Sequence, residues 1–399
     1  MNAQPSTGSR LTSIDALRGA IMIIMALDHV RDFFHVAAGS FSPTDLTQTW
    51  PALFFTRWIT HYCMPVFMFT AGMGAFLFGQ RNRTKRQLSW FLFTRGVWFI
   101  ALELTVMQLA YDFNFSLHFT ILLLILWIFG ICMILMAGLI HLPIRWLAGV
   151  SAAVIVFHNC LDGIDASRFG SWGWAWNLLH EPGTISLAGR QVLVPYTVLP
   201  WIGVLGAGYC FGQIFRLEPA RRRRIMLSAG LALTVAFVVV RAVNRYGDPA
   251  PWSQQKSAVF TVLSFLNCTK YPASLDFLLM TLGPSLLVLA YLDGRSFKAD
   301  NPLVVFGRVP MFYFVMHFYL IHTLRVLAAL HHYGGWAVKF IFNPLPSMDG
   351  PQQLFPQNFG YGLGVVYGVW LLTVVALYPI CRWFARVKAT RSNWWLSYL

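Results

Sequence analysis

The sequence predicts an all-α, polytopic integral membrane protein with about ten transmembrane helices in one bundle. Of its 399 residues, 57% are hydrophobic and only 11% are charged, and apolar windows recur along the whole length. This composition is typical of membrane proteins and unlike that of a soluble protein. Because a hydrocarbon core of about 30 Å needs about 20 apolar residues per helix, ten spans are expected. They cover approximately residues 14–36, 52–79, 88–111, 117–140, 143–160, 194–214, 222–243, 273–292, 303–329 and 359–385.

Basic residues alternate from loop to loop in the way that the positive-inside rule requires. Short loops on one side of the ten-span topology carry the arginines and lysines, whereas loops 39–51 and 111–116 on the other side carry none. This predicts that both termini are cytoplasmic, with tails 1–12 and 387–399 flanking one transmembrane domain, 13–386. The run Arg221–Arg224 and the net charge of +15 then indicate an anionic lipid bilayer as partner, not nucleic acid.

Three longer segments, 161–193, 244–272 and 331–357, fall on the outer side. They combine Trp or Tyr with Pro and Gly, which predicts ordered loops and interfacial helices. Lys270 and Tyr271 stand at the mouth of the eighth span. The six cysteines show no metal-ligand spacing, so no metal site is predicted.

The first span carries ionisable residues at both ends. Each such group costs about 2.5–3.5 kcal/mol inside a membrane, so these side chains should pair, line a cavity or take part in chemistry. Asp15 and Arg18 lie three residues apart near the inner end and can pair on one face. Together with Arg95 of the third span, they are candidates for binding a phosphorylated cofactor on the inner side.

A polar stripe occupies the outer end of the same span. Asp28, Asp32 and His35 follow each other at positions i, i+4 and i+7, and His29 lies three residues before Asp32. A carboxylate beside an imidazole fixes its tautomer and raises its basicity, as a general base requires. The stripe therefore predicts a catalytic base held by Asp28 and Asp32, with a salt-bridged helix end as the alternative.

Other spans add polar groups at similar depth. Arg57 and His61 lie one turn apart at the start of the second span, where Pro65 should bend the helix. His317, His322 and Arg325 lie on the ninth span. An interhelical hydrogen bond of ordinary strength is the alternative role for His317, and a packing histidine bonded to a neighbouring carbonyl is the alternative for His61.

These residues are expected to meet in one polar chamber that opens to the outside. Its predicted members are Asp28, His29, Asp32, His35, Arg57, His61 and His317. Glu103, near mid-membrane, is expected to pair with Arg95 or with an arginine of the outer half.

Five motifs resemble the heparan-alpha-glucosaminide N-acetyltransferase catalytic-domain family, which includes many bacterial members and belongs with other transmembrane acyltransferases. They are SIDALRG, MALDHVRDFF, TRWITHYCMPVFMFTAG, TKYPASLDFLLMTLGP and FGRVPMFYFVMHFYLIH. The resemblance runs from about Ser13 to the C-terminal helix. It implies acetyl transfer from cytoplasmic acetyl-CoA to an amino sugar or glycan across the membrane. For this chain, it implies a multi-pass enzyme of the bacterial inner (plasma) membrane.

The resemblance also suggests which residues act. In lysosomal members, a histidine in the outward region after the first helix is catalytic and has an asparagine nearby. Here His29 holds the position of the asparagine, and His35 is the nearest downstream histidine. His35 is therefore the first candidate, His29 the second and His61 the rival. Arg57, His317, His322 and Arg325 are candidates for binding the acceptor.

Two other functions fit the same residues. A proton-coupled transporter of a glycan or lipid-linked precursor would also need acidic groups and histidines inside the membrane. O-acylation of a surface polysaccharide would use the same chemistry on another acceptor. The sequence also leaves a homodimer open.

Overall fold

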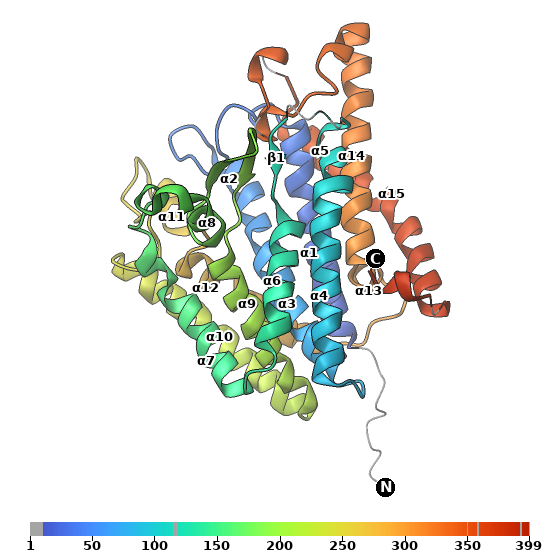
Figure 1. The fold of residues 1–399 in the computed structure, drawn as a ribbon. Coiled ribbons are helices and arrows are strands. Elements are labelled where there is room, and N and C mark those ends of the chain that lie inside the picture. Colours follow the sequence, from blue (N-terminus) through green and yellow to red (C-terminus); the bar gives the residue numbers. More distant parts are fainter. Residues whose placement is uncertain are drawn as a thin grey trace.

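The computed structural model describes residues 11–114, 116, 119–348, 350–356, 359–391 and 393–398, which form a helical bundle with one small sheet (Figure 1). Within this described part, eight helical stretches are long and apolar enough to cross a membrane. This confirms the predicted all-α polytopic fold. The stretches are Pro51–Gly79, Lys85–Asp112, Ile144–Leu161, Val198–Arg216, Pro219–Val243, Leu275–Asp293, Pro310–Lys339 and Leu363–Thr390.

Two further helices fill the remaining predicted ranges. Helix α1 (Thr12–Phe34) has 23 residues and carries the charged groups of the first span. Helix α6 (Ile125–Leu139) is apolar but has only 15 residues. The predicted start of the fourth span, near residue 117, lies outside the described residues, but the helix itself begins later than predicted, at Ile125. Strand β1 (Ile121–Leu122) precedes the helix and pairs with a later strand, so its backbone is extended.

Two of the long stretches change their winding. Pro51–Gly79 consists of α2 (Pro51–Trp58), a 3₁₀ turn (Ile59–Tyr62) and α3 (Cys63–Gly79). Pro65 has no N–H for the carbonyl four residues earlier, so the irregular turn lies where the sequence predicts a bend. Lys85–Asp112 consists of α4 (Lys85–Leu102), a π-helical turn (Glu103–Met107) and α5 (Gln108–Asp112).

The remaining helices follow in chain order. They are α7 (Ile144–Phe157), α8 (Gly173–Leu179), α9 (Val198–Phe211), α10 (Pro219–Val243), α11 (Ala258–Leu266), α12 (Leu275–Asp293), α13 (Pro302–Arg308), α14 (Pro310–Tyr333) and α15 (Leu363–Thr390). The ninth predicted span is divided between α13 and α14, because Pro310 begins a new helix. Helix α15 continues past the predicted boundary at residue 386.

The segment between α7 and α9 contains a hairpin that the sequence does not predict. Strand β2 (Gly183–Leu187) pairs antiparallel with β3 (Arg190–Val194), and β1 adds to β3 in parallel. Ala188 and Gly189 form the two-residue turn with φ of 51° and 78°. Positive φ at both positions matches the twist of a tight hairpin.

Helix α1 lies at the centre of the bundle and contacts α2, α3, α12, α13, α14 and α15 (Figure 1). Ser13, Asp15, Asp28, Arg31 and the following His35 are all buried. The charged groups of α1 therefore face protein rather than lipid, which removes much of the cost of placing them in a membrane.

Glycine pairs bring four pairs of helices into close contact. At each crossing, an added Cβ on either glycine would lie within 3.0 Å of an atom of the other helix. Small residues let helix backbones approach in this way where packing rather than water exclusion drives association. The pairs are Gly19 with Gly307 (α1 and α13), Gly72 with Gly208 (α3 and α9), Gly96 with Gly130 (α4 and α6) and Gly230 with Gly283 (α10 and α12).

Candidate functional site

A cavity of about 500 Å³ lies at the end of the bundle where α1 ends, and we call it the chamber. Its walls come from α1, α2, α14, the loop that follows α1, and the loops that precede α9 and α12. The polar side chains that line it include Asp28, His29, Arg31, Asp32, Arg57, Thr60, Tyr196, Lys270 and Tyr271. Four of the seven predicted members, Asp28, His29, Asp32 and Arg57, are therefore brought together.

Asp28 is the best-connected polar group of the chamber. Both of its oxygens accept from Arg57 Nη1, at 2.7 and 2.6 Å. Arg31 Nη1 lies 2.9 Å from Oδ1, and Thr60 Oγ1 donates to the same oxygen at 2.9 Å. These contacts join α1 to the second membrane-spanning stretch and occupy both carboxylate oxygens of Asp28.

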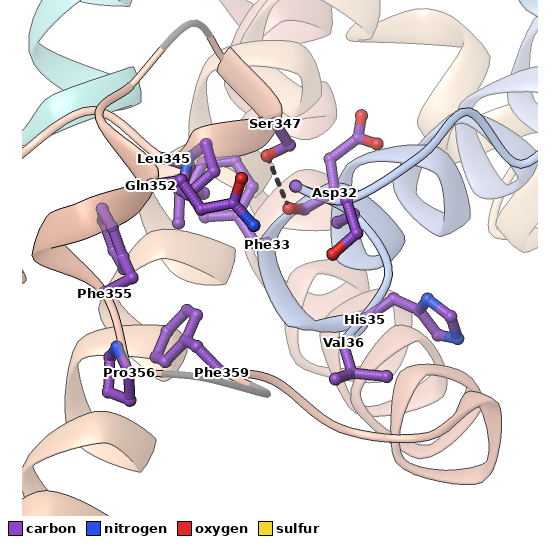
Figure 2. A pocket seen from close by; sticks show the side chains of 14 residues that line it. Asp32, Phe33, His35, Val36, Leu345, Ser347, Gln352, Phe355, Pro356 and Phe359 are labelled. Atoms are coloured by element: carbon purple, nitrogen blue, oxygen red, sulfur yellow. Dashed lines mark hydrogen bonds between the residues drawn. The ribbon is translucent and has the colours of Figure 1, made fainter.

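Asp32, one turn later, belongs to the same network. Its Oδ1 accepts from Arg31 Nη2 at 2.5 Å. Its main-chain oxygen accepts from Ser347 Oγ at 2.9 Å, which ties the segment before α15 to the end of α1 (Figure 2). The two carboxylates are thus held by arginines. These ion pairs take the place of the hydrogen bonds that His35 was predicted to donate to Asp28 and Asp32.

His35 lines a separate, smaller cavity of about 140 Å³, beside the chamber (Figure 2). The two cavities share the wall formed by Asp32, residues 38–40, Pro346 and Ser347. The His35 Nδ1 atom accepts the main-chain N–H of Ala37 at 3.2 Å. This bond fixes Nε2 as the protonated nitrogen of the neutral ring, so His35 offers no free lone pair in this state.

His29 lines the chamber, and its ring contacts that of a second histidine, His317. The ring of His317 lies 5.1 Å away between centroids, at a tilt of 50°. His317 is fully buried and does not line the chamber. Its Nδ1 donates to the main-chain oxygen of Tyr313 at 3.1 Å. Within the described part of the chain, His29 Nδ1 and His317 Nε2 are buried without a hydrogen-bond partner.

The other predicted site residues lie outside the chamber. His61 is buried, with its ring 5.4 Å from that of Phe277. His322 Nδ1 donates to the main-chain oxygen of Ala110 at 2.8 Å, and its Nε2 accepts from Arg325 at 3.1 Å. Arg325 borders another cavity of about 150 Å³. Direct contact of His61, His317, His322 or Arg325 with a ligand in the chamber is thus not supported by this geometry.

Five of the nine polar chamber residues named above are absent from the predicted site: Arg31, Thr60, Tyr196, Lys270 and Tyr271. The sequence places Lys270 and Tyr271 at the mouth of a span, which is the signal that points to them. Tyr196 has no comparable signal, because only the fold brings its hydroxyl to 3.3 Å from that of Tyr271. Lys270 Nζ lies 5.2 Å from the ring centre of Tyr271.

A fourth cavity, of about 310 Å³, lies along the other half of α1. Its lining is mainly apolar, with Arg18 and Arg95 as its charged members. Arg18 donates to the hydroxyl and the main-chain oxygen of Thr70. Asp15 is not among the lining residues and faces Arg308 Nε at 3.9 Å. Two of the three predicted cofactor residues therefore share this cavity, which we call the inner cavity.

The inner cavity and the chamber meet inside the bundle. Met25 of α1, Ile125 of α6 and Phe314 of α14 line both. The two cavities thus follow one another along α1 and share these apolar side chains as part of their walls. His29 stands one helical turn beyond Met25, at the chamber side of the junction.

Among the described residues, Glu103 pairs with no arginine, which corrects that prediction. Its Oε1 accepts from the hydroxyl of Tyr111 at 2.9 Å. Its Oε2 accepts from the main-chain N–H groups of Leu126 and Trp127 at 2.7 and 3.1 Å. These are early N–H groups of α6, which have no partner within the helix. Glu103 therefore caps a neighbouring helix and lies outside the site.

Comparison with known proteins agrees with this architecture. The sequence profile of the family described as "Heparan-alpha-glucosaminide N-acetyltransferase, catalytic" matches residues 10–243, more than half of the 399 residues. A search of curated proteins gave no match. The matched region contains α1, both arginines of the inner cavity and most polar groups of the chamber. The chain belongs to the heparan-alpha-glucosaminide N-acetyltransferase catalytic-domain family and is a membrane acetyltransferase.

Proposed function

We propose that the enzyme transfers an acetyl group from acetyl-CoA in the inner cavity to an amino sugar or glycan acceptor in the chamber. The observation that carries this proposal is the junction at Met25, Ile125 and Phe314, where the two cavities meet. A donor entering from one side of the membrane and an acceptor entering from the other would meet there. We propose that the membrane is a bacterial inner membrane and that both termini and the donor side of the enzyme face the cytoplasm.

The lining of the inner cavity suits the donor. The pantetheine arm of acetyl-CoA is long and narrow, and an apolar channel can hold it extended. Arg95 supplies positive charge to this cavity. Its Cζ atom lies 4.2 Å from the ring centre of Phe91 and 5.4 Å from that of Tyr398. Its Nε is buried without a hydrogen-bond partner within the described part of the chain. Arg18 and Arg95 are the cations that would attract the phosphate-bearing donor.

His29 is the base that the chamber geometry favours. The main-chain oxygen of Tyr313 can only accept, so His317 carries its proton on Nδ1 and presents Nε2 as an acceptor. A small ring rotation or one bridging water would then let His29 Nδ1–H donate to His317. This arrangement leaves the His29 Nε2 lone pair for the chamber. His317 would thereby orient the base, as the third group of a catalytic triad does.

The reaction follows from these positions. His29 Nε2 takes a proton from the acceptor's ammonium group, and the free amine attacks the thioester carbonyl. A C–N bond forms and the C–S bond breaks. The amine nitrogen loses its second proton to the leaving CoA thiolate, and His29 releases the first proton to solvent. Arg57 provides positive charge near the oxygen of the tetrahedral intermediate. The carboxylates of Asp28 and Asp32 hold Arg57 and Arg31 in place.

Thiol release from acetyl-CoA by the purified protein, with glucosamine as acceptor, tests this function. His29→Gln should lower turnover by about 10²–10⁴-fold, the usual contribution of a general base, with little change in the KM for acetyl-CoA. His61→Gln is the matched control and should retain activity. If His35→Gln abolishes transfer while His29→Gln retains it, the base lies in the smaller cavity. Absence of acceptor-dependent thiol release from the wild-type protein would refute acetyl transfer and leave transport as the alternative.

The role of His317 has its own signature. His317→Gln should shift the pH profile of kcat, because the partner that sets the protonation of His29 is altered. Tyr313→Phe is the matched control, since His317 is bonded to the main-chain oxygen of Tyr313 and not to its hydroxyl. Equal effects of both substitutions would indicate a packing role for this part of α14.

A further inference from the structure

Charge in the chamber is not balanced. Two carboxylates, Asp28 and Asp32, face two guanidinium groups, those of Arg31 and Arg57, at 2.5 to 2.9 Å. These four groups compensate each other. Lys270 adds a third cation to the same cavity.

Among the described residues, none places a carboxylate oxygen within 4.0 Å of Lys270 Nζ. Its neighbours are two aromatic rings, Tyr271 at 5.2 Å and Tyr196 at 6.0 Å from Nζ to the ring centre. Burial by itself would raise the pKa of Tyr271, yet the positive charges of Lys270 and Arg57 outweigh it and hold that pKa below its usual value. The region around Lys270 is therefore electropositive.

The loop that carries Lys270 is held rigidly. Asp248 accepts from the main-chain N–H and the hydroxyl of Thr269, both at 2.8 Å. It also accepts from Ser274 Oγ at 2.7 Å. Thr269 and Ser274 are joined through their main chains at 3.0 Å. The start of the lysine side chain is thus fixed at the chamber wall, which is the preorganisation that a binding group requires.

We propose that Lys270, flanked by Tyr196 and Tyr271, forms a subsite for an acidic group of the acceptor. The substrate class is then an amine that also bears a carboxylate or a phosphate, such as an acidic amino sugar. This inference rests on the proposed function for the identity of the ligand as acceptor. The acid group binds Lys270, the tyrosine hydroxyls donate to its oxygens, and the amine reaches toward His29 across the chamber.

A binding measurement without acetyl-CoA tests the subsite apart from catalysis. Glucosamine 6-phosphate and glucosamine are titrated into the purified full-length protein by isothermal titration calorimetry. A charge-assisted contact should make the wild-type protein prefer the phosphorylated sugar by about tenfold to hundredfold. Lys270→Gln should abolish this preference and leave the affinity for glucosamine unchanged. Lys270→Arg, which keeps the charge, should retain it.

Lys256→Gln is the matched control, because this lysine lies in the same connection between α10 and α12 but packs over Phe260 outside the chamber. It should keep the preference. Vesicles of phosphatidylglycerol should not compete with the sugar phosphate; competition would assign the subsite to a lipid headgroup and overturn the proposal. The proposal is also overturned if the wild-type protein binds the two sugars with equal affinity, or if the Lys270→Gln variant still prefers the phosphorylated sugar. Failure of thiol release would instead refute acetyl transfer, so the two failures are distinguishable.

Discussion

The ion pair between Arg57 and Asp28 is expected to hold the second membrane-spanning stretch against α1. Arg57 Nη1 contacts both oxygens of Asp28, at 2.7 and 2.6 Å, and the two side chains are only 15% and 11% exposed. The perturbation is a double-mutant cycle with Arg57→Met, Asp28→Asn and both together. Each single substitution removes one charge of a largely desolvated pair and leaves the other.

The remaining contacts set the size of each effect. Breaking a buried ion pair costs about 3–5 kcal/mol. Arg57→Met leaves Asp28 with Arg31 and Thr60, so its cost should be near the lower limit, about 3 kcal/mol. Asp28→Asn keeps an acceptor for Arg57 but no charge, so a similar cost of about 3 kcal/mol is expected. The double variant leaves Arg31 paired with Asp32 and should cost less than the sum by about 2 kcal/mol.

Unfolding of the purified protein in mixed micelles, followed by tryptophan fluorescence, measures these free energies. The coupling should also persist at raised ionic strength, because a buried pair is little screened by salt. Additive effects within about 0.5 kcal/mol would show that the two residues act independently. That result would refute the ion pair as the link between the two helices.

Three other predictions concern packing, capping and topology. Gly19→Ala should destabilise the bundle by about 1–3 kcal/mol in the same assay, because the added Cβ would overlap the main chain of α13. Gly138→Ala is the control: Gly138 has open space around it, so this substitution should not destabilise the bundle. Glu103→Ala should cost about 1–3 kcal/mol through the unpaired N–H groups of α6, and equal stability of this variant and the wild type would exclude the cap. Reporter fusions should read cytoplasmic at Asn82 and external at Thr47, and a reversal at either position would overturn the proposed orientation.

Hydropathy was sufficient to predict much of the architecture. Apolar runs of about 20 residues are a bilayer requirement that each segment meets alone, so the helical ranges could be read without knowledge of their neighbours. The same reasoning failed at the start of α6, where β1 pairs with β3 about 70 residues later. A strand of two residues has no periodicity of its own, and its existence depends on the partner.

The site was predicted less completely. Helical spacing correctly grouped Asp28, His29 and Asp32 on one helix near the chamber, because positions along a helix determine which residues are neighbours. The same spacing could not show that Arg57 and Arg31, rather than His35, would bind the carboxylates. Residues at matched depth were also not all in one cavity: His61 and His317 are enclosed by other side chains.

The sequence by itself determined that α1 carries charge into a membrane and that these charges need partners. Only the tertiary structure decided which partners they have, which ring faces the chamber, and that the two cavities meet at Met25, Ile125 and Phe314. The physical reason is that spacing along a helix is fixed by its 3.6-residue repeat, whereas contacts between helices depend on rotation and depth. In this protein, glycine crossings such as that of Gly19 with α13 allow the close helix contacts on which those two quantities depend.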